Sequence, residues 1–342
     1  MMLILSNCLT EKTDEGCLKV ANSLVKRLLA EKPDTPVITY DRKPQYETQH
    51  IPLNKFLLSR TLFRTLREKN EPILYIPFPA REWATAMRIF ILSRISRKKV
   101  TVLLTMRCRC GWLGRQFLKL SDADLITLSA DTAALYQKIL GDRRVIYLKT
   151  GVDTEKFSPV TPEQKMALRE KYGLDPETPV VLHVGHLKSG RNVGQLMKLD
   201  PACQVVLVAS THTKDEQDTD LKAALLRRPN VKIIDTYLPE IEEIYQLSDV
   251  YFFPVVAEKN CIDVPLSCLE AAACDKPVIT TAYGEMAAFR GAEGFQFIES
   301  FDGAYLNQLV ANALVQQNVS TRRAALEYHW QNGVSLLKSI GS

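Results

Sequence analysis

Short apolar runs alternate with longer amphipathic segments along most of this 342-residue chain. Runs rich in Val, Ile and Leu are typical of strands that are buried on both faces of a parallel sheet. Their alternation with helical segments predicts βαβ units and therefore an α/β fold. The expected strands lie near residues 3–5, 37–39, 73–76, 100–104, 125–128, 145–148, 180–185, 205–209, 231–234, 250–254, 278–281 and 295–298.

These strands form two series, which are separated by residues 151–179. The separating segment contains four prolines and a charged helical stretch at 161–172, a composition typical of a linker. We therefore expect two Rossmann-like, doubly wound parallel-sheet domains in tandem, at residues 1–152 and 153–322. The chain ends in a helical segment, of which residues 323–342 are expected to cross over and pack on the first domain.

The helix expected after Pro265 is apolar nearly all round, which predicts that it is buried. Only Ser267 and Glu270 interrupt it, and their spacing of three places them on one face. A carboxylate is rarely buried without a partner, so we expect Glu270 to face a polyol such as the 2′,3′-diol of a ribose. The alternative is a surface helix with a solvated glutamate. The strand at 278–281 then leads into a turn at Gly284, and in open α/β sheets ligands bind at such strand ends.

Composition points to an ordinary globular protein, with 46% hydrophobic and 24% charged residues. No apolar run is long enough to span a membrane, and residues 2–6 predict a first buried strand rather than a signal peptide. Eight cysteines are scattered without a Cys-x-x-Cys pair, and the spacing of Cys108 and Cys110 does not suit a zinc site. We expect reduced thiols, no metal site and a cytoplasmic location.

Charge is divided unevenly along the chain. Residues 1–150 carry 26 Lys and Arg against 14 Asp and Glu, whereas residues 151–342 carry 18 against 25. The basic residues of the first half alternate with apolar ones near 56–67, 88–99 and 107–119. Basic amphipathic helices indicate contact with an anionic membrane surface, and core helices with solvated basic ends explain the pattern equally well. No nucleic-acid-binding motif accompanies the charge, so we expect no nucleic acid partner.

The segment from Thr150 to Pro159 (TGVDTEKFSP) resembles the interdomain segment of family-4 retaining glycosyltransferases, which have the GT-B fold. Four further segments agree with this family in order and spacing, at residues 121–129, 184–192, 247–254 and 269–281. The resemblance covers most of the second half of the chain, and the first half matches only in outline.

The resemblance implies that a hexose is transferred from a UDP- or GDP-sugar with retention of its anomeric configuration. It implies no required metal, since cationic side chains and helix N-termini can stabilise the departing diphosphate. The second domain would bind the nucleotide-sugar donor. The basic first domain would bind a glycan, lipid-linked or phosphorylated acceptor, which the membrane interpretation places at the cytoplasmic face of a membrane.

The family has an arginine and a lysine in the loop that follows the strand ending at Gly185. Here these positions are His186 and Arg191, which the resemblance assigns to the diphosphate together with the amides of Leu266 and Ser267. Arg191 keeps the positive charge and offers a two-pronged donor. His186 is cationic only if a neighbour holds its proton, and otherwise it is a neutral hydrogen-bonding residue.

The carboxylates also depart from the family pattern, which has two glutamates separated by seven residues. Glu270 matches the second, on the ribose, but the first falls on Ile262. We prefer Asp263 to Glu258 as the carboxylate that binds sugar hydroxyls. Asp263 lies directly before a helix, so a helix cap is the competing interpretation.

Three further assignments follow from the resemblance. Gly16 stands where the family has a glycine-rich turn beside the donor phosphates, although an ordinary turn needs a glycine as well. Arg107 replaces a histidine that many members have near the donor sugar, and it could pair with a phosphate, pair with an anionic acceptor, or belong to the basic surface. Tyr237 and Leu238 lie in the loop expected beside the base, where Tyr237 either stacks on it or only packs the loop.

The departures at Arg107, His186 and Ile262 leave two alternatives open. One is a glycosyltransferase-like protein that binds a nucleotide or a partner without turnover. The other is a GT-B nucleotide-sugar epimerase, against which the interdomain segment argues.

Overall fold

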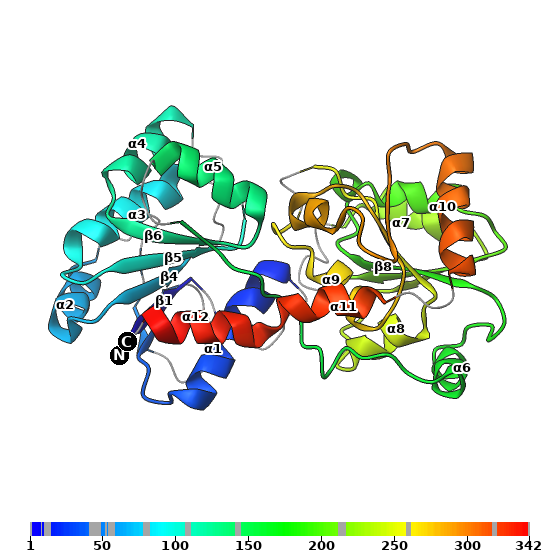
Figure 1. The fold of residues 1–342 in the computed structure, drawn as a ribbon, viewed down its shortest axis with the longest axis horizontal. Coiled ribbons are helices and arrows are strands. Elements are labelled where there is room, and N and C mark those ends of the chain that lie inside the picture. The colour runs from blue at the N-terminus through cyan, green and yellow to red at the C-terminus, as the bar shows by residue number, and fades with distance from the viewer. Residues whose placement is uncertain are drawn as a thin grey trace. The chain divides into compact units, whose positions relative to one another are not determined.

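The computed structural model describes residues 2–7, 9, 15–40, 49–51, 53, 59–77, 83–106, 111–140, 145–210, 217–257, 261–316 and 320–340. The chain divides into two compact units, one made of residues 1–150 with 330–342 and the other of residues 151–329 (Figure 1). The sequence placed the return to the first domain at residue 323. In the structure, residues 323–329 belong to the second unit.

The first unit contains a parallel sheet with the strand order β3-β2-β1-β4-β5-β6-β7. Its strands are β1 (Leu3–Ser6), β2 (Val37–Thr39), β3 (Gln49–His50), β4 (Ile73–Ile76), β5 (Val100–Leu104), β6 (Ala123–Thr127) and β7 (Val145–Tyr147). Its helices are α1 (Gly16–Glu31), α2 (Arg60–Lys69), α3 (Trp83–Ile95), α4 (Trp112–Leu120), α5 (Ala130–Leu140) and α12 (Trp330–Ile340). Helices α1 and α12 pack together on one face, and the apolar sides of α2 to α5 form a core with the other face (Figure 1).

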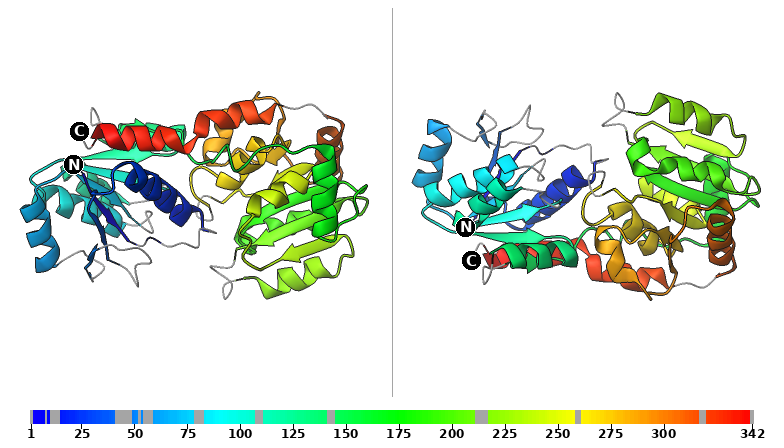
Figure 2. Two further views of the ribbon diagram at one scale, coloured as in Figure 1. Left: turned by 90° about the horizontal axis from the view of Figure 1, so that it is seen from below. Right: turned by 90° about the horizontal axis from the view of Figure 1, so that it is seen from above.

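The second unit contains a parallel sheet with the order β10-β9-β8-β11-β12-β13, a layer with helices on both of its sides (Figure 2). Its strands are β8 (Val180–Gly185), β9 (Gln204–Ala209), β10 (Val231–Ile234), β11 (Val250–Phe253), β12 (Val278–Thr280) and β13 (Phe295–Phe297). Its helices are α6 (Pro162–Lys171), α7 (Thr219–Leu226), α8 (Ile241–Leu247), α9 (Leu266–Ala273), α10 (Gly303–Val315) and α11 (Thr321–Ala325). The same unit also contains short 3₁₀ helices between these elements, at η1 (Ser189–Arg191), η2 (Val193–Lys198), η4 (Gly284–Phe289) and η5 (Leu326–Tyr328).

All twelve strands expected from the apolar pattern are present, and the doubly wound α/β architecture is confirmed. The linker helix is present as α6, which begins with a complete capping box between Thr161 and Gln164. The sequence missed β3, because this edge strand has only two residues and both are polar and exposed. In the described part of the chain, no helix has both the length and the apolar character needed to cross a bilayer.

The C-terminal segment is not the single helix that the sequence predicts from Thr321 to Ile340. It is divided into α11, η5 and α12, and the backbone at His329 is extended. The break has a physical cause, because the two halves are anchored in different units. The Arg322 guanidinium of α11 donates to the carbonyls of Phe157 and Thr154 in the second unit. Helix α12 packs on α1 in the first unit.

The second sheet has a topological switch point between β8 and β11. These strands are neighbours, but the chain continues from β8 to β9 on one side and from β11 to β12 on the other. Their backbone pairing is short and covers only Val181 with Val250 and Leu182 with Tyr251. Open α/β sheets bind ligands in the crevice at the carboxyl ends of strands at such a point.

Candidate functional site

Seven of the predicted site residues follow the two strands of this switch point. The last residue of β8 and the loop that follows it carry three of them, and the segment after β11 carries the other four. In chain order they are Gly185, His186 and Arg191, then Asp263, Leu266, Ser267 and Glu270. Residues that are far apart in the sequence are thereby brought to the carboxyl ends of two neighbouring strands of one sheet.

The loop after β8 is a tight double turn that folds Arg191 back over the strand end. The Lys188 amide donates to the His186 carbonyl at 3.0 Å, and the Arg191 amide donates to the Lys188 carbonyl at 2.9 Å. A Cβ atom added to Gly185 would lie 3.0 Å from Nη1 of Arg191, so the glycine makes room for the guanidinium. Arg191 is only 8% exposed, and its Nε has no hydrogen-bond partner among the described residues. A buried cation with an unpaired donor favours an anion at this place.

Asn192 ties the same loop to the end of β11 across the switch point. Its backbone is left-handed, with φ of 59°, a conformation that asparagine tolerates. Its side-chain amide donates to the Pro254 carbonyl at 3.2 Å and its oxygen accepts from Gln195 at 2.9 Å. The sequence does not assign Asn192 a role, because its contact with Pro254 joins positions 62 residues apart and cannot be inferred from local spacing.

His183 is a second residue that sequence reasoning missed. It lies within β8, is completely buried, and places Nδ1 2.8 Å from the Phe252 carbonyl oxygen. Burial, with a smaller effect from the charge of Arg191, lowers the pKa of His183 to about 4, against the opposing effect of the Phe252 hydrogen bond. The imidazole is therefore neutral at pH 7. The only signal in the sequence was a lone histidine inside an otherwise apolar strand.

The low pKa of His183 makes a prediction for stability. Because the folded pKa lies below the usual value of 6.5, the unfolded chain takes up this proton first as the pH falls. The contribution of neutral His183 to the free energy of unfolding is fully present above pH 6.5. It declines as the pH falls toward 4, and at pH 5 it is smaller by about 2 kcal/mol. Urea unfolding measures the free energy of unfolding at pH 7.5 and at pH 5. Between these two pH values it should fall less for His183→Asn than for the wild type. Equal declines would contradict the assignment.

Helix α9 is buried along its whole length except at Ser267. Glu270 is 3% exposed, and its Oε2 accepts a hydrogen bond of 2.8 Å from the Tyr245 hydroxyl. The surface-helix alternative is therefore wrong. Burial and the nearby Glu270 carboxylate raise the pKa of Tyr245 well above its usual value, so the tyrosine remains a donor. It fixes one side of the carboxylate in place.

Tyr251 links the two elements that carry the site. Its hydroxyl donates to the Val184 carbonyl at 3.2 Å, near the end of β8. Burial raises the pKa of Tyr251, and a hydrogen bond with the Ser267 side chain on α9 opposes that rise. The end of β8 and the first turn of α9 are thus held by one side chain of β11.

Asp263 is held through its backbone by the turn after β12. Its carbonyl accepts from the Glu285 amide at 2.8 Å, and its side chain is buried. The N-cap position of α9 is occupied by Pro265, two residues after Asp263. Binding of sugar hydroxyls and a capping role at the start of α9 both remain predictions for the Asp263 carboxylate. Ile262, which replaces the family's first glutamate, is buried with the apolar core residues.

The remaining predicted residues lie elsewhere or outside the described part. Gly16 is the first residue of α1 in the first unit and is half-buried. Tyr237 is 45% exposed and Leu238 is half-buried, in a loop whose Pro239 carbonyl accepts from Lys156 at 3.1 Å. Arg107, Glu258, Cys108 and Cys110 lie outside the described residues. In the described ranges, no three His, Cys, Asp or Glu side chains form a group that could hold a metal ion.

Comparison with known proteins gives a match to one family model over part of the chain, and a fold for the whole. Residues 178–312 match the family model described as Glycosyl transferases group 1. A GDP-mannose-dependent monoacylated alpha-(1-6)-phosphatidylinositol monomannoside mannosyltransferase of Corynebacterium glutamicum is 27% identical over 220 residues, which cover 60% of this chain and 56% of that protein. The chain thus matches about half the length of this curated relative.

Among the solved structures that resemble this chain, two illustrate a match over nearly its whole length. A glycosyltransferase from Rickettsia africae superposes with a TM-score of 0.75 at 12% identity, covering 99% of this chain and 97% of its own. The Anabaena protein HepE, in complex with UDP and glucose, superposes with a TM-score of 0.71 at 14% identity, covering 99% and 98%. Because the sequence identity is so low, these structural similarities establish the fold alone.

Proposed function

We propose that this chain, a family-4-like glycosyltransferase with the GT-B fold, transfers a hexose from a UDP- or GDP-sugar to a hydroxyl acceptor. We further propose that the anomeric configuration is retained and that no metal is required. One observation carries the proposal. A buried guanidinium, at Arg191, whose Nε has no partner among the described residues, and a buried carboxylate, at Glu270, follow the two strands of a single switch point. They match the two polar parts of a sugar nucleotide, its diphosphate and its ribose diol.

The chemical step depends mainly on the residues around the diphosphate. As the bond from the anomeric carbon to the phosphate oxygen breaks, negative charge grows on the leaving group. Arg191 binds that charge with two parallel hydrogen bonds, and the first turn of α9, which begins directly after Pro265, offers the amides of Leu266 and Ser267. His186 adds a hydrogen-bonding group in the same loop. The acceptor oxygen bonds to the face that the leaving group vacates, and its proton passes to the leaving phosphate oxygen.

The remaining contacts determine how the donor is held. Glu270, oriented by Tyr245, accepts hydrogen bonds from the ribose hydroxyls. Asp263 accepts hydrogen bonds from the sugar hydroxyls, and the exposed ring of Tyr237 and the backbone of Leu238 contact the base. For the first unit, Gly16 and Arg107 remain predictions for phosphate or acceptor binding.

Product analysis tests this function. The purified full chain is incubated with UDP-glucose or GDP-mannose, with and without a lipid extract or hexose phosphates as acceptors. The proposal predicts nucleotide release that depends on an acceptor, and a product linkage with the donor's anomeric configuration. A sugar altered without any acceptor would indicate an epimerase. Absence of turnover with every donor and acceptor would favour a binding protein without catalysis.

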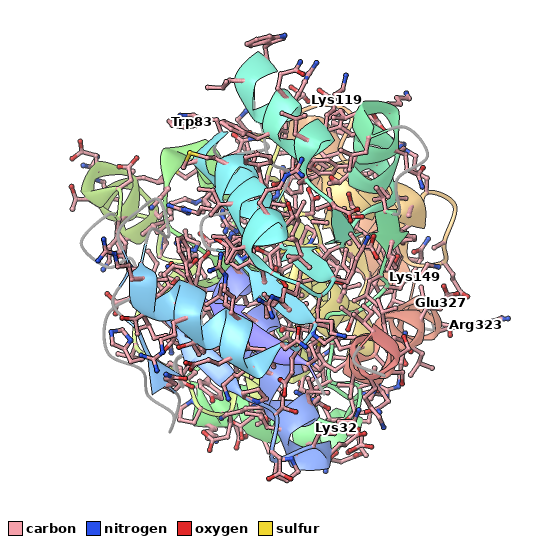
Figure 3. All side chains as sticks on the ribbon, turned by 90° about the vertical axis from the view of Figure 1, so that its left-hand side faces the viewer. Lys32, Trp83, Lys119, Lys149, Arg323 and Glu327 are labelled. Carbon is pink, nitrogen blue, oxygen red and sulfur yellow. The ribbon has the colours of Figure 1, made fainter. Side chains whose placement is uncertain are left out.

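We also propose that the first unit contacts an anionic membrane through α3 and α4. Trp83 and Trp112, at the N-terminal ends of these helices, are 46% and 74% exposed. The helices pack side by side, with the Phe90 and Phe117 rings 5.7 Å apart. Figure 3 shows Trp83 on one side of this pair and Lys119 on the other. Exposed tryptophans beside Lys and Arg suit the interface of an anionic bilayer.

Vesicle sedimentation tests the membrane contact at low and high salt. Arg115→Gln on α4 should weaken binding to anionic vesicles about fivefold at low salt and little at high salt, because one basic residue near the surface contributes about 1 kcal/mol. Trp112→Ser should weaken binding at both salt concentrations. Leu226→Ser, an exposed apolar position on α7 of the second unit, is the matched control and should have no effect. Wild-type protein that stays in the supernatant at low salt would contradict the proposal.

A further inference from the structure

The backbone ladder between β8 and β11 is continued by a side chain. Backbone pairing ends at Leu182 and Tyr251, where the two strands begin to diverge. The next carbonyl of β11, that of Phe252, is paired with Nδ1 of His183 at 2.8 Å. The residue at this position must therefore donate a hydrogen bond, and a plain aromatic ring would leave a buried carbonyl unpaired.

This hydrogen bond determines which nitrogen of His183 carries the proton. A carbonyl can only accept, so Nδ1 is protonated and Nε2 of the neutral ring presents a lone pair. The ring plane is held between Tyr251 and Phe253, whose ring centroids each lie 6.5 Å away. Nε2 is buried and has no hydrogen-bond partner in the described ranges. An unpaired buried acceptor is unfavourable, which suggests that a partner reaches it in another state of the site.

Nε2 of His183 and the guanidinium of Arg191 face the same small space. Gly185 lies two residues after His183, on the same face of the strand. A Cβ atom added to Gly185 would lie 3.3 Å from His183 Nε2 and 3.0 Å from Arg191 Nη1. No side chain of Gly185 separates the two groups, and the Nε of Arg191 is itself buried without a partner among the described residues. A buried acceptor and buried donors are therefore complementary across this glycine.

We propose that His183 is a positioning residue, whose Nε2 accepts a hydrogen bond from the Arg191 guanidinium when the donor diphosphate is bound. This rests on the proposed function, which supplies the diphosphate. A neutral acceptor behind the guanidinium restricts its rotation without adding charge, so its outward N–H groups keep one direction. A second cation at position 183 would repel Arg191, and an apolar ring would leave it unanchored.

Two substitutions separate the two nitrogens of His183. In His183→Asn, the amide nitrogen occupies the place of Nδ1 and can still donate to Phe252, but nothing replaces Nε2. In His183→Gln, the longer side chain carries an acceptor to the place of Nε2 and gives up the bond to Phe252. Calorimetric titration with UDP and GDP measures affinity, and thermal unfolding measures stability. We expect His183→Asn to melt closer to the wild type than His183→Gln does, because it keeps the hydrogen bond to Phe252, and to bind the nucleotide about tenfold more weakly. We expect His183→Gln to melt earlier and to keep its affinity within about threefold.

A double-mutant cycle tests whether His183 acts through Arg191. In an Arg191→Ala background, adding His183→Asn should change nucleotide affinity by less than about twofold. Wild-type affinity in His183→Asn would overturn the inference, and so would a tenfold loss that persists without Arg191. A wild-type protein that binds neither UDP nor GDP would instead contradict the proposed function, and with it the premise of this inference.

Discussion

Replacing Arg191 by alanine should lower kcat/KM for the nucleotide sugar by about 100- to 1,000-fold. Removing one donor that stabilises developing charge in a buried site has an effect of this size. Arg191 has a larger role than a surface cation, because it is buried over Gly185 and follows the strand at the switch point. Initial rates at subsaturating donor, with a saturating acceptor, measure the change.

Two further variants make the Arg191 prediction specific. Arg191→Lys keeps the charge but loses the two-pronged geometry, so it should retain part of the activity, with a loss of about tenfold. Arg290→Ala removes an exposed arginine of the same unit, which is paired with Glu299, and should leave the rate unchanged. An Arg191→Ala variant that melts like the wild type and keeps full kcat/KM would contradict the assignment.

Replacing Gly284 by alanine should destabilise the second unit by about 3 kcal/mol or more. Gly284 has φ of 51°, and a Cβ atom there would lie 2.2 Å from the Asp263 carbonyl oxygen. That oxygen also accepts the hydrogen bond from Glu285, so the segment leading into α9 has to move. Thermal unfolding should show the transition of this unit about 6–12 °C lower.

The control for Gly284 is Gly291→Ala. Gly291 also has a left-handed backbone, with φ of 82°, but a Cβ atom there meets nothing within 4 Å. Gly291→Ala should lower the free energy of unfolding only by the cost of a left-handed backbone at alanine, about 1–2 kcal/mol. Similar losses of stability in the two variants would show that the close approach of Gly284 to Asp263 does not affect stability. A larger loss for Gly284→Ala, accompanied by weaker donor binding, is the expected result.

Much of the fold follows from local patterns in the sequence. The apolar runs predict all twelve longer strands, since strands buried on both faces need continuous apolar residues. The nearly all-apolar composition of α9 predicts its burial and singles out Glu270. The structure adds Tyr245, which is 25 residues away in the sequence and whose hydrogen bond orients that carboxylate.

The parts that could not be predicted depend on contacts between distant segments. The break at His329 arises because α11 and α12 are anchored in different units, whereas the local sequence favours one helix. His183 was passed over because its partner, the Phe252 carbonyl, is defined only once β8 and β11 are neighbours. The same holds for Gly284, whose requirement for glycine comes from Asp263 on another segment.

The most direct test of a nucleotide-sugar site is calorimetric titration of UDP, GDP and ADP, without added metal, into the wild type and Glu270→Gln. The glutamine can still accept the Tyr245 hydrogen bond, so the variant should fold normally, but it lacks the charge that favours the ribose hydroxyls. We expect UDP or GDP to bind the wild type and to bind Glu270→Gln at least about tenfold more weakly. Binding of none of the three nucleotides, or equal affinity in the two proteins, would contradict the account.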